Sequence, residues 1–264
     1  MSLGLYDLAT QPFLELYVIL LGVTIAAGFL IPRWLRPGGY PGLVTNIGEL
    51  AYLAGGMARF TDAVVAHLLA TRALAMVGKK RFHALTRGSG RTEIELTVLA
   101  LPGEQRWKEI SRSLEPHAEP IERRLVADHL LMDARLTLQW RFWQTLPYFL
   151  LLPFGAIKVI VDEMRHRPVG YLVALLILTA ILALIRWSAV DRLTQGGLAA
   201  LKGARSKAAR LKLAPTPMET DLAVALFGTV VLVASAWSGF HEFRTARLGV
   251  GVRSGDDGGG CGGC

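Results

Sequence analysis

The stretch VGYLVALLILTAILALI, residues 169–185, contains no charged side chain. A helix needs about 17–25 predominantly apolar residues to cross the hydrocarbon core of a bilayer, so this stretch predicts a transmembrane span. Residues 222–240 are also uncharged, and Phe13–Ile31 contains Glu15 as its only charged residue. Residues 1–12 contain no Lys or Arg, unlike the basic start of a cleaved signal peptide. The sequence therefore predicts a polytopic membrane protein with a retained N-terminal anchor.

The composition of the chain indicates that much of it faces lipid. Of its 264 residues, 52% are hydrophobic and 19% are charged, and the mean hydropathy is +0.38. A soluble globular chain carries about 25% charged residues. The charges gather in residues 79–141 and 186–212, which predicts aqueous segments between apolar spans. We interpret the net charge of +8 as Lys and Arg that face anionic lipid, and not as a nucleic-acid signal.

A fourth apolar segment, Gln144–Val161, contains Pro147, Pro153 and Lys158. It could cross the bilayer or re-enter from one side, and Lys158 lies near enough to its end to reach the interface. The basic loop at 186–217 favours a crossing, because this loop is cytoplasmic only if all four segments cross. We therefore expect four spans, with both termini extracytoplasmic.

Residues 38–141, between the first and second spans, predict a mostly helical cytoplasmic domain. Helical patterns over residues 46–71 are interrupted at Gly55-Gly56. Two short segments, Leu74–Val77 and Phe82–Leu85, then flank a Gly-Lys-Lys-Arg turn, which is typical of a hairpin. Helix, turn, helix and hairpin is the order of a winged helix, so we expect a winged-helix-like insert.

The expected fold class is therefore membrane all-α, with about four transmembrane helices and the insert between the first and second. The expected divisions are an N-terminal anchor at 1–37, the winged-helix-like domain at 38–141, a three-helix transmembrane region at 142–240 with a basic cytoplasmic loop at 186–217, and a tail at 241–264.

The only two cysteines, Cys261 and Cys264, lie in the tail SGDDGGGCGGC, residues 254–264. The glycines leave both thiols within reach of one ion, and two thiolates suit a soft ion such as Cu(I). A closed zinc site would need two further ligands. The alternatives are a disulfide, enzymatic modification of the thiols, or an inert flexible end. Cys261 and Cys264 are therefore the candidate metal ligands.

No catalytic motif is evident. The six histidines lack H-E-x-x-H spacing, and neither a G-x-x-x-x-G-K-[ST] loop nor a G-x-S-x-G elbow occurs, so we do not expect an enzyme. The basic turn Lys79–Arg81 would suit a wing that contacts phosphates. The preceding helix offers only Arg59, His67 and Arg72 for reading bases, so we do not expect nucleic acid as a partner.

Several short segments resemble a family of uncharacterised bacterial polytopic membrane proteins with Gly/Cys-rich C-terminal tails. The resemblance lies in Leu5–Ala9, Glu49–Gly56, Arg167–Gly170 and the Gly/Cys-rich terminus. Some members are encoded near iron-dependent oxygenases that modify peptide cysteines, which implies a thiol-modified or metal-handling tail. The present tail departs from the richer tracts in having only two cysteines. The resemblance implies no catalytic residue.

These observations predict a multi-pass protein of the bacterial plasma membrane that handles metal or thiols at the envelope through Cys261 and Cys264. The alternative is a membrane-anchored interaction or regulatory protein that acts through its cytoplasmic domain. The expected partners are the lipid bilayer, other membrane proteins and, for the first function, a tail-modifying enzyme.

Overall fold

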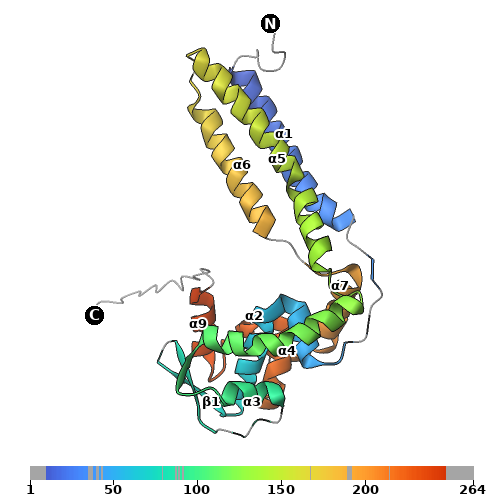
Figure 1. Ribbon diagram of the computed structural model, residues 1–264, viewed down its shortest axis with the longest axis vertical. Helices are drawn as coiled ribbons and strands as arrows, with labels where there is room; N and C mark the ends of the chain where they lie inside the picture. The colour runs from blue at the N-terminus through green and yellow to red at the C-terminus, as the bar shows by residue number, and fades with distance from the viewer. Residues whose placement is uncertain are drawn as a thin grey trace, which may run out of the picture. The chain divides into compact units, whose positions relative to one another are not determined.

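The computed structural model describes residues 10–34, 38–39, 42, 44–78, 80–86, 88, 90, 92–166, 168–188, 192–213 and 215–247. The chain is mostly helical and divides into two compact units (Figure 1). The helical unit is built from the described parts of 1–41 and 128–198, and the mixed unit from those of 42–127 and 199–264. Each unit therefore combines two stretches that are distant in sequence.

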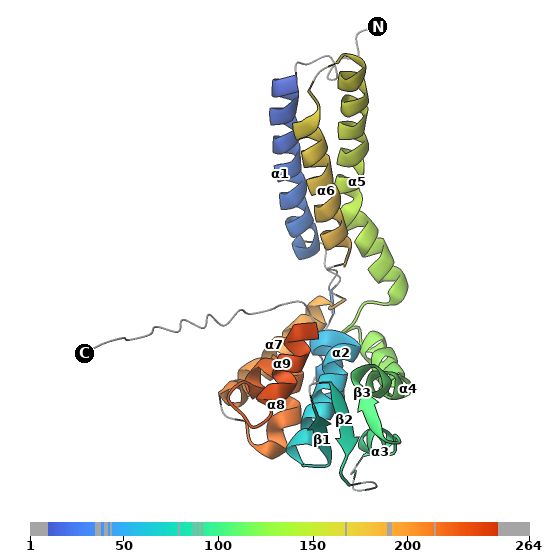
Figure 2. The ribbon, with the colours of Figure 1, turned by 90° about the vertical axis from the view of Figure 1, so that its left-hand side faces the viewer.

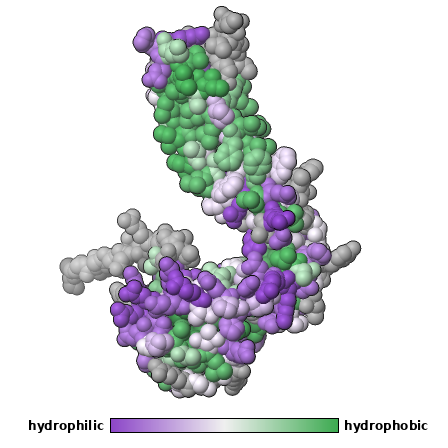
Figure 3. All heavy atoms as spheres, viewed as in Figure 1, coloured by the Kyte–Doolittle hydropathy of each residue, from purple (hydrophilic) through white to green (hydrophobic). Residues whose placement is uncertain are grey.

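The helical unit contains α1 (Thr10–Trp34), α5 (Ala134–Met164) and α6 (Gly170–Ser188). Among the described residues, these three helices are long and apolar enough to cross a membrane. Large apolar side chains lie exposed along all three, and Figure 3 shows apolar residues over the visible face of this unit. An exposed apolar surface of this extent marks a membrane-facing surface. The first and third spans predicted from the sequence are confirmed as such helices, and α5 contains the segment 144–161.

The helices of this unit pack closely around an aromatic and aliphatic core. Phe13, Tyr17 and Leu21 of α1 are buried against Leu151 of α5 and Leu172 of α6. The Tyr17 hydroxyl also lies 3.2 Å from the Thr179 hydroxyl of α6 in a buried hydrogen bond. This bond pairs two hydroxyl groups that would otherwise lie unpaired in an apolar environment.

The residues before α5 and after α6 are bound to each other. Leu131 and Leu193 form an isolated antiparallel bridge, and the Thr194 hydroxyl donates to the His129 carbonyl oxygen at 2.7 Å. A side chain at Gly197 would collide with the Leu130 carbonyl oxygen. The chain segments that precede α5 and follow α6 therefore lie side by side.

The mixed unit is a helical body with one small sheet (Figure 2). Its first stretch forms α2 (Ile47–Ala70), β1 (Leu74–Val77), β2 (Arg81–Ala84), α3 (Glu93–Leu99), β3 (Glu104–Arg106) and α4 (Trp107–Ala127). Helix α7 (Gln195–Lys207) leads into its second stretch, which forms α8 (Thr220–Phe227) and α9 (Ser238–Arg247). The sheet is antiparallel in the order β1-β2-β3.

Local sequence signals explain the first half of the mixed unit. The Asn46 side chain accepts from the backbone N–H of Gly48 and caps α2. The helix is kinked at Gly55 and Gly56, and the φ of +61° at Gly56 is one that L side chains rarely adopt. The hairpin formed by β1 and β2 lies where the sequence predicts it. The order helix, kink, helix, hairpin agrees with the expectation, while a winged-helix fold for the insert stays a prediction.

The fourth predicted span differs from the structure. Residues 222–240 form no continuous helix: α8 ends at Phe227, Gly228 turns the chain with a φ of +89°, and a 3-10 helix covers Thr229–Leu232 before α9 begins. Many apolar side chains of this segment, among them Val224, Leu226 and Phe240, are buried within the mixed unit, where α8 packs along α2. The segment is apolar because it contributes side chains to the core of this unit.

The observed units also divide the chain differently from the predicted domains. The predicted insert at 38–141 contributes only part of the mixed unit, because α8 and α9 complete its core. Residues 128–141 belong instead to the helical unit, where α5 begins. The predicted boundary at 241 falls inside α9.

Candidate functional site

Two arginines lie directly opposite each other in the sheet of the mixed unit. Strand β2 begins at Arg81 and strand β3 ends at Arg106, and the antiparallel register pairs these residues. Lys80 precedes β2 and Lys108 follows β3, and all four side chains are exposed. Like charges directly opposite each other destabilise a sheet, so the pairing of Arg81 with Arg106 lowers the stability of the mixed unit.

Only one of these four cations has an acidic partner in the described part of the chain. The Arg81 guanidinium lies 2.8 Å from Glu104 in an exposed ion pair. Lys80, Arg106 and Lys108 form no ion pair with the residues that the structure describes. The end of the sheet therefore carries a surplus of positive charge.

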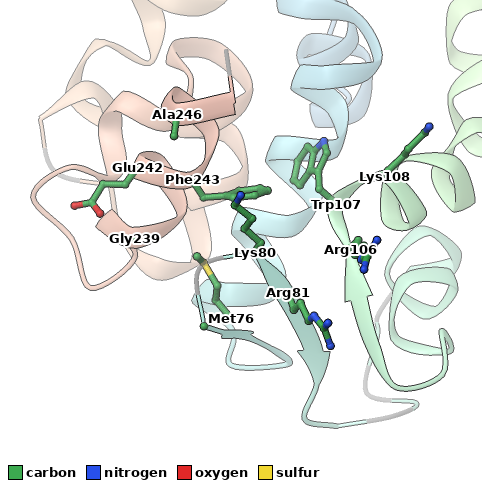
Figure 4. Close-up of a pocket in the computed structure, with 11 residues that line it drawn as sticks. Met76, Lys80, Arg81, Arg106, Trp107, Lys108, Gly239, Glu242, Phe243 and Ala246 are labelled. Carbon is green, nitrogen blue, oxygen red and sulfur yellow. The ribbon is translucent and has the colours of Figure 1, made fainter. Parts of the chain in front are cut away.

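These cations line a groove of about 880 Å³ between the sheet and helix α9 (Figure 4). Helix α9 supplies Gly239, Glu242, Phe243 and Ala246, while Met76, Gly78 and Trp107 complete the lining. Pockets for small molecules typically measure about 300–1,000 Å³. The groove therefore combines a cationic side, one carboxylate and apolar surface in a volume suited to a small ligand.

An aromatic cluster holds the α9 side of the groove in place. The rings of Phe82, Trp107, Phe240 and Phe243 lie with their centroids 5.8–6.5 Å apart. These separations suit edge-to-face and offset contacts. Phe82 and Phe240 are fully buried, whereas Phe243 keeps part of its ring accessible at the groove.

A buried ion pair attaches α9 to α2 beneath this cluster. Arg244 Nε lies 2.5 Å from Asp62 Oδ1, and Arg244 Nη2 donates to Asp62 Oδ2 at 3.2 Å. The same guanidinium lies 4.2 Å from the centre of the Trp107 ring. Burial raises the pKa of Asp62, and the charge of Arg244 opposes that rise. Arg244 therefore fixes the position of α9 relative to α2 and α4.

The predicted base-reading residues on α2 serve the interior instead. Arg59 is partly buried, burial lowers its pKa, and its guanidinium occupies the space where a side chain at Gly228 would lie. His67 lies 3.6 Å from Asp221 and 3.8 Å from Glu95. Helix α2 packs against α8 and α3.

Lys158 of α5 does not reach an aqueous interface, so its predicted role as an interfacial anchor is wrong. Its side chain is fully buried, and its ammonium lies 2.9 Å from Asp162, one turn further along α5. The ammonium also lies 5.3 Å from the centre of the Phe13 ring of α1. The i, i+4 spacing of Lys158 and Asp162 was the only sequence signal for this ion pair.

The candidate metal ligands Cys261 and Cys264 lie outside the described residues. Within the described part of the chain, no group of three or more His, Cys, Asp or Glu residues is placed to hold a metal ion. The predicted basic turn does contribute to the groove, through Lys80 and Arg81. Sequence reasoning missed the Arg106-Trp107-Lys108 stretch, whose alternation of cations and an aromatic ring was a readable signal, and it missed Glu242 and Phe243.

Comparison of the chain with protein-family models, with curated proteins and with solved structures finds no match.

Proposed function

We propose that the protein is a membrane-anchored binding protein whose mixed unit captures an anionic partner in the cytoplasm. The helices α1, α5 and α6 anchor it in the bilayer, and the groove between the sheet and α9 is the binding site. This is the interaction or regulatory role expected as the alternative from the sequence. A winged-helix-like insert would fit this role, because its hairpin supplies Lys80 and Arg81 to the groove.

The observation that carries the proposal is the pairing of Arg81 with Arg106. The pair lies at a solvent-exposed groove, where Lys80 and Lys108 add to an already unfavourable concentration of positive charge. A bound anion would relieve the mutual repulsion, because guanidinium groups form strong charge-assisted hydrogen bonds with oxyanions. A structural role would not require Lys80, Arg106 and Lys108 to be exposed and without an ion-pair partner among the described residues.

The proposed membrane topology follows from the way the mixed unit is assembled. Residues 42–127 and 199–247 pack into one body, although α5 and α6 lie between them in the sequence. Two crossings, by α5 and then α6, return the chain to the side that it left. A single crossing would separate the two halves of the unit. Because α1 crosses once more, we propose three crossings.

The proposed orientation follows from the positive-inside rule. The basic residues of 186–217 favour a cytoplasmic mixed unit, so with three crossings we propose that residues 1–9 lie outside and residues 248–264 inside. This differs from the four-span prediction, which put both termini outside. The resemblance described above suggests the bacterial plasma membrane. Metal or thiol chemistry at Cys261 and Cys264, with Cu(I) as the suggested ion, stays a prediction that no structural observation favours.

Binding of a simple polyanion tests the proposal. The full chain in lipid nanodiscs is titrated with tripolyphosphate by calorimetry, and we expect saturable binding that weakens as salt is raised. The double substitution Arg106→Gln and Lys108→Gln should raise the Kd by about ten-fold or more. The matched control, Lys202→Gln and Lys207→Gln, removes two exposed charges from α7 and should leave the Kd unchanged. Absence of binding, or an equal loss in both variants, would refute the proposed role of the groove.

A further inference from the structure

We propose that the ligand of the groove is a nucleotide, with its phosphates on the paired arginines and its base against Phe243. This inference rests on the proposed function, because it names the kind of anion that the groove takes. Three features of the groove carry it: the spacing of the cations, the accessible aromatic ring, and the single carboxylate on α9.

Four cations line the groove, and two of them are arginines that lie opposite each other in the sheet. Arg81 and Arg106 are cross-strand neighbours, so their Cβ atoms lie about 4.5–5.5 Å apart. Lys80 directly precedes Arg81, Lys108 lies two residues after Arg106, and both lysines line the groove as further donors. A polyphosphate presents several oxyanions within a similar span, whereas the carboxylates of an acidic peptide are distributed along an extended chain. The planar donor fork of arginine also matches phosphate oxygens in pairs.

Phe243 provides the aromatic surface. The Trp107 ring is only 6% exposed, and Arg244 covers one of its faces, so Trp107 contributes little surface to a ligand. Phe243 is partly exposed and lies on the α9 side of the groove (Figure 4). Every base has a π-face that can stack on such a ring. A flat base therefore has an apolar surface on which to lie, across the groove from the strands that carry the arginines.

Among the described residues that line the groove, Glu242 is the one carboxylate. It projects from α9, while the arginines project from the sheet. A carboxylate repels phosphates and accepts hydrogen bonds from hydroxyl or amino groups. Glu242 therefore favours the sugar or the base on the α9 side and the phosphates on the sheet side, which sets one orientation for the ligand.

The groove also has unfilled space on the α9 side. A Cβ atom at Gly239 would meet no atom within 4 Å, although Gly239 lines the groove. A larger side chain at Gly239 therefore extends into open space without a clash at its first carbon. Gly239→Leu thus tests whether the ligand occupies that space, and it should not impair folding because leucine favours a helix more than glycine does.

The experiment compares ATP with tripolyphosphate, which lacks the base and sugar, on the full chain in lipid nanodiscs. We expect Arg106→Gln to weaken both ligands by a similar factor of about ten. Phe243→Leu should weaken ATP by about ten-fold and tripolyphosphate by less than about two-fold, because stacking acts on the base alone. Gly239→Leu should also weaken ATP more than tripolyphosphate, and it preserves the aromatic cluster if Phe243→Leu disturbs folding.

Each outcome bears on the inference. If tripolyphosphate binds as tightly as ATP and neither the Phe243 nor the Gly239 variant discriminates between them, the nucleotide inference is overturned while the anion-binding role survives. If neither ligand binds, both the inference and the proposed function are refuted. If a short DNA duplex binds but ATP does not, the ligand is a nucleic acid and the nucleotide inference is equally overturned.

Discussion

Arg244 extends from α9 to two other elements of the mixed unit. It pairs with Asp62 of α2 and covers the Trp107 ring of α4, and both charged side chains are less than 10% exposed. Removal of one partner leaves the other charge buried, which typically costs about 3–5 kcal/mol. We expect Arg244→Met to lower the free energy of unfolding of the mixed unit by about this amount. Urea unfolding followed by hydrogen exchange of its backbone amides provides the measurement.

An exposed pair in the same unit provides the control for this prediction. Arg210 and Glu219 also pair across a turn, but the Arg210 side chain is 66% exposed. Solvent screens an exposed ion pair, so Arg210→Met should change stability little. The double variant Asp62→Asn with Arg244→Met should regain part of the loss, because no charge is then left buried. Similar losses in the Arg210 and Arg244 variants would contradict the assigned role of Arg244.

At the scale of elements, Gly155 sets how closely the three membrane helices approach. A Cβ atom at Gly155 of α5 would lie 2.7 Å from a ring carbon of Tyr17 in α1 and 2.9 Å from a methyl carbon of Leu176 in α6. Small residues at such positions allow helices to pack closely in lipid. Gly155→Val should destabilise the helical unit by about 1–3 kcal/mol. The expected readout is a lower Tm in detergent, measured by loss of the monodisperse species on heating.

The same substitution at Gly22 of α1 gives a matched control. A Cβ atom there meets nothing within 4 Å, so Gly22→Val adds a branched side chain at an open position of a membrane helix. Its Tm should remain near that of the unmodified chain. A loss of stability as large as that of Gly155→Val would show that the effect arises from valine itself and not from close helix packing.

Elements defined by local signals could be predicted from the sequence. All but the first residue of the uncharged stretch at 169–185 lie in α6. The hairpin lies at β1 and β2, as predicted, because its turn residues and short apolar segments are local features. Residues 222–240 could not be assigned in this way. Length and hydropathy do not distinguish a span from a segment buried in a protein core. The chain leaves helical structure at Gly228 and again at residues 233–237, and Gly228 and Ser235 were the sequence signals for these breaks, because glycine and serine are poorer helix formers than alanine or leucine.

The groove could be predicted only in part for a related reason. The basic turn before β2 was visible in the sequence, and it lines the groove through Lys80 and Arg81. The pairing of Arg81 with Arg106 depends on the register of two strands that are separated by α3. Glu242 and Phe243 come from a helix distant in sequence. Tertiary assembly brings these side chains together, and no local pattern encodes it.

At the scale of the whole molecule, the mixed unit depends on both of its chain segments. Helix α8 packs along α2, and Ala223, Val224 and Leu226 are buried there. Residues 42–127 alone would expose the complementary face of α2. We expect this fragment to aggregate or remain unfolded, whereas residues 42–127 joined by a Gly/Ser linker to 199–247 should fold. Sedimentation and amide dispersion in NMR spectra measure the difference. A folded 42–127 fragment would contradict this dependence and favour the independent insert predicted from the sequence.

The number of crossings determines which parts of the chain share a side of the membrane. Because α5 and α6 return the chain to the mixed unit, and residues 222–240 belong to that unit, we expect residue 2 outside and residues 206 and 261 inside. Single cysteines at Ser2→Cys and Ser206→Cys, each in a Cys261→Ser, Cys264→Ser background, test the first two positions. A chain that keeps only Cys261 tests the third. A membrane-impermeant maleimide should label residue 2 in intact spheroplasts and the other two only after permeabilisation. If Cys261 is labelled in intact spheroplasts while Ser206→Cys is protected, the chain crosses the membrane a fourth time. Residues 222–240 would then form a span and would not belong to the core of the mixed unit.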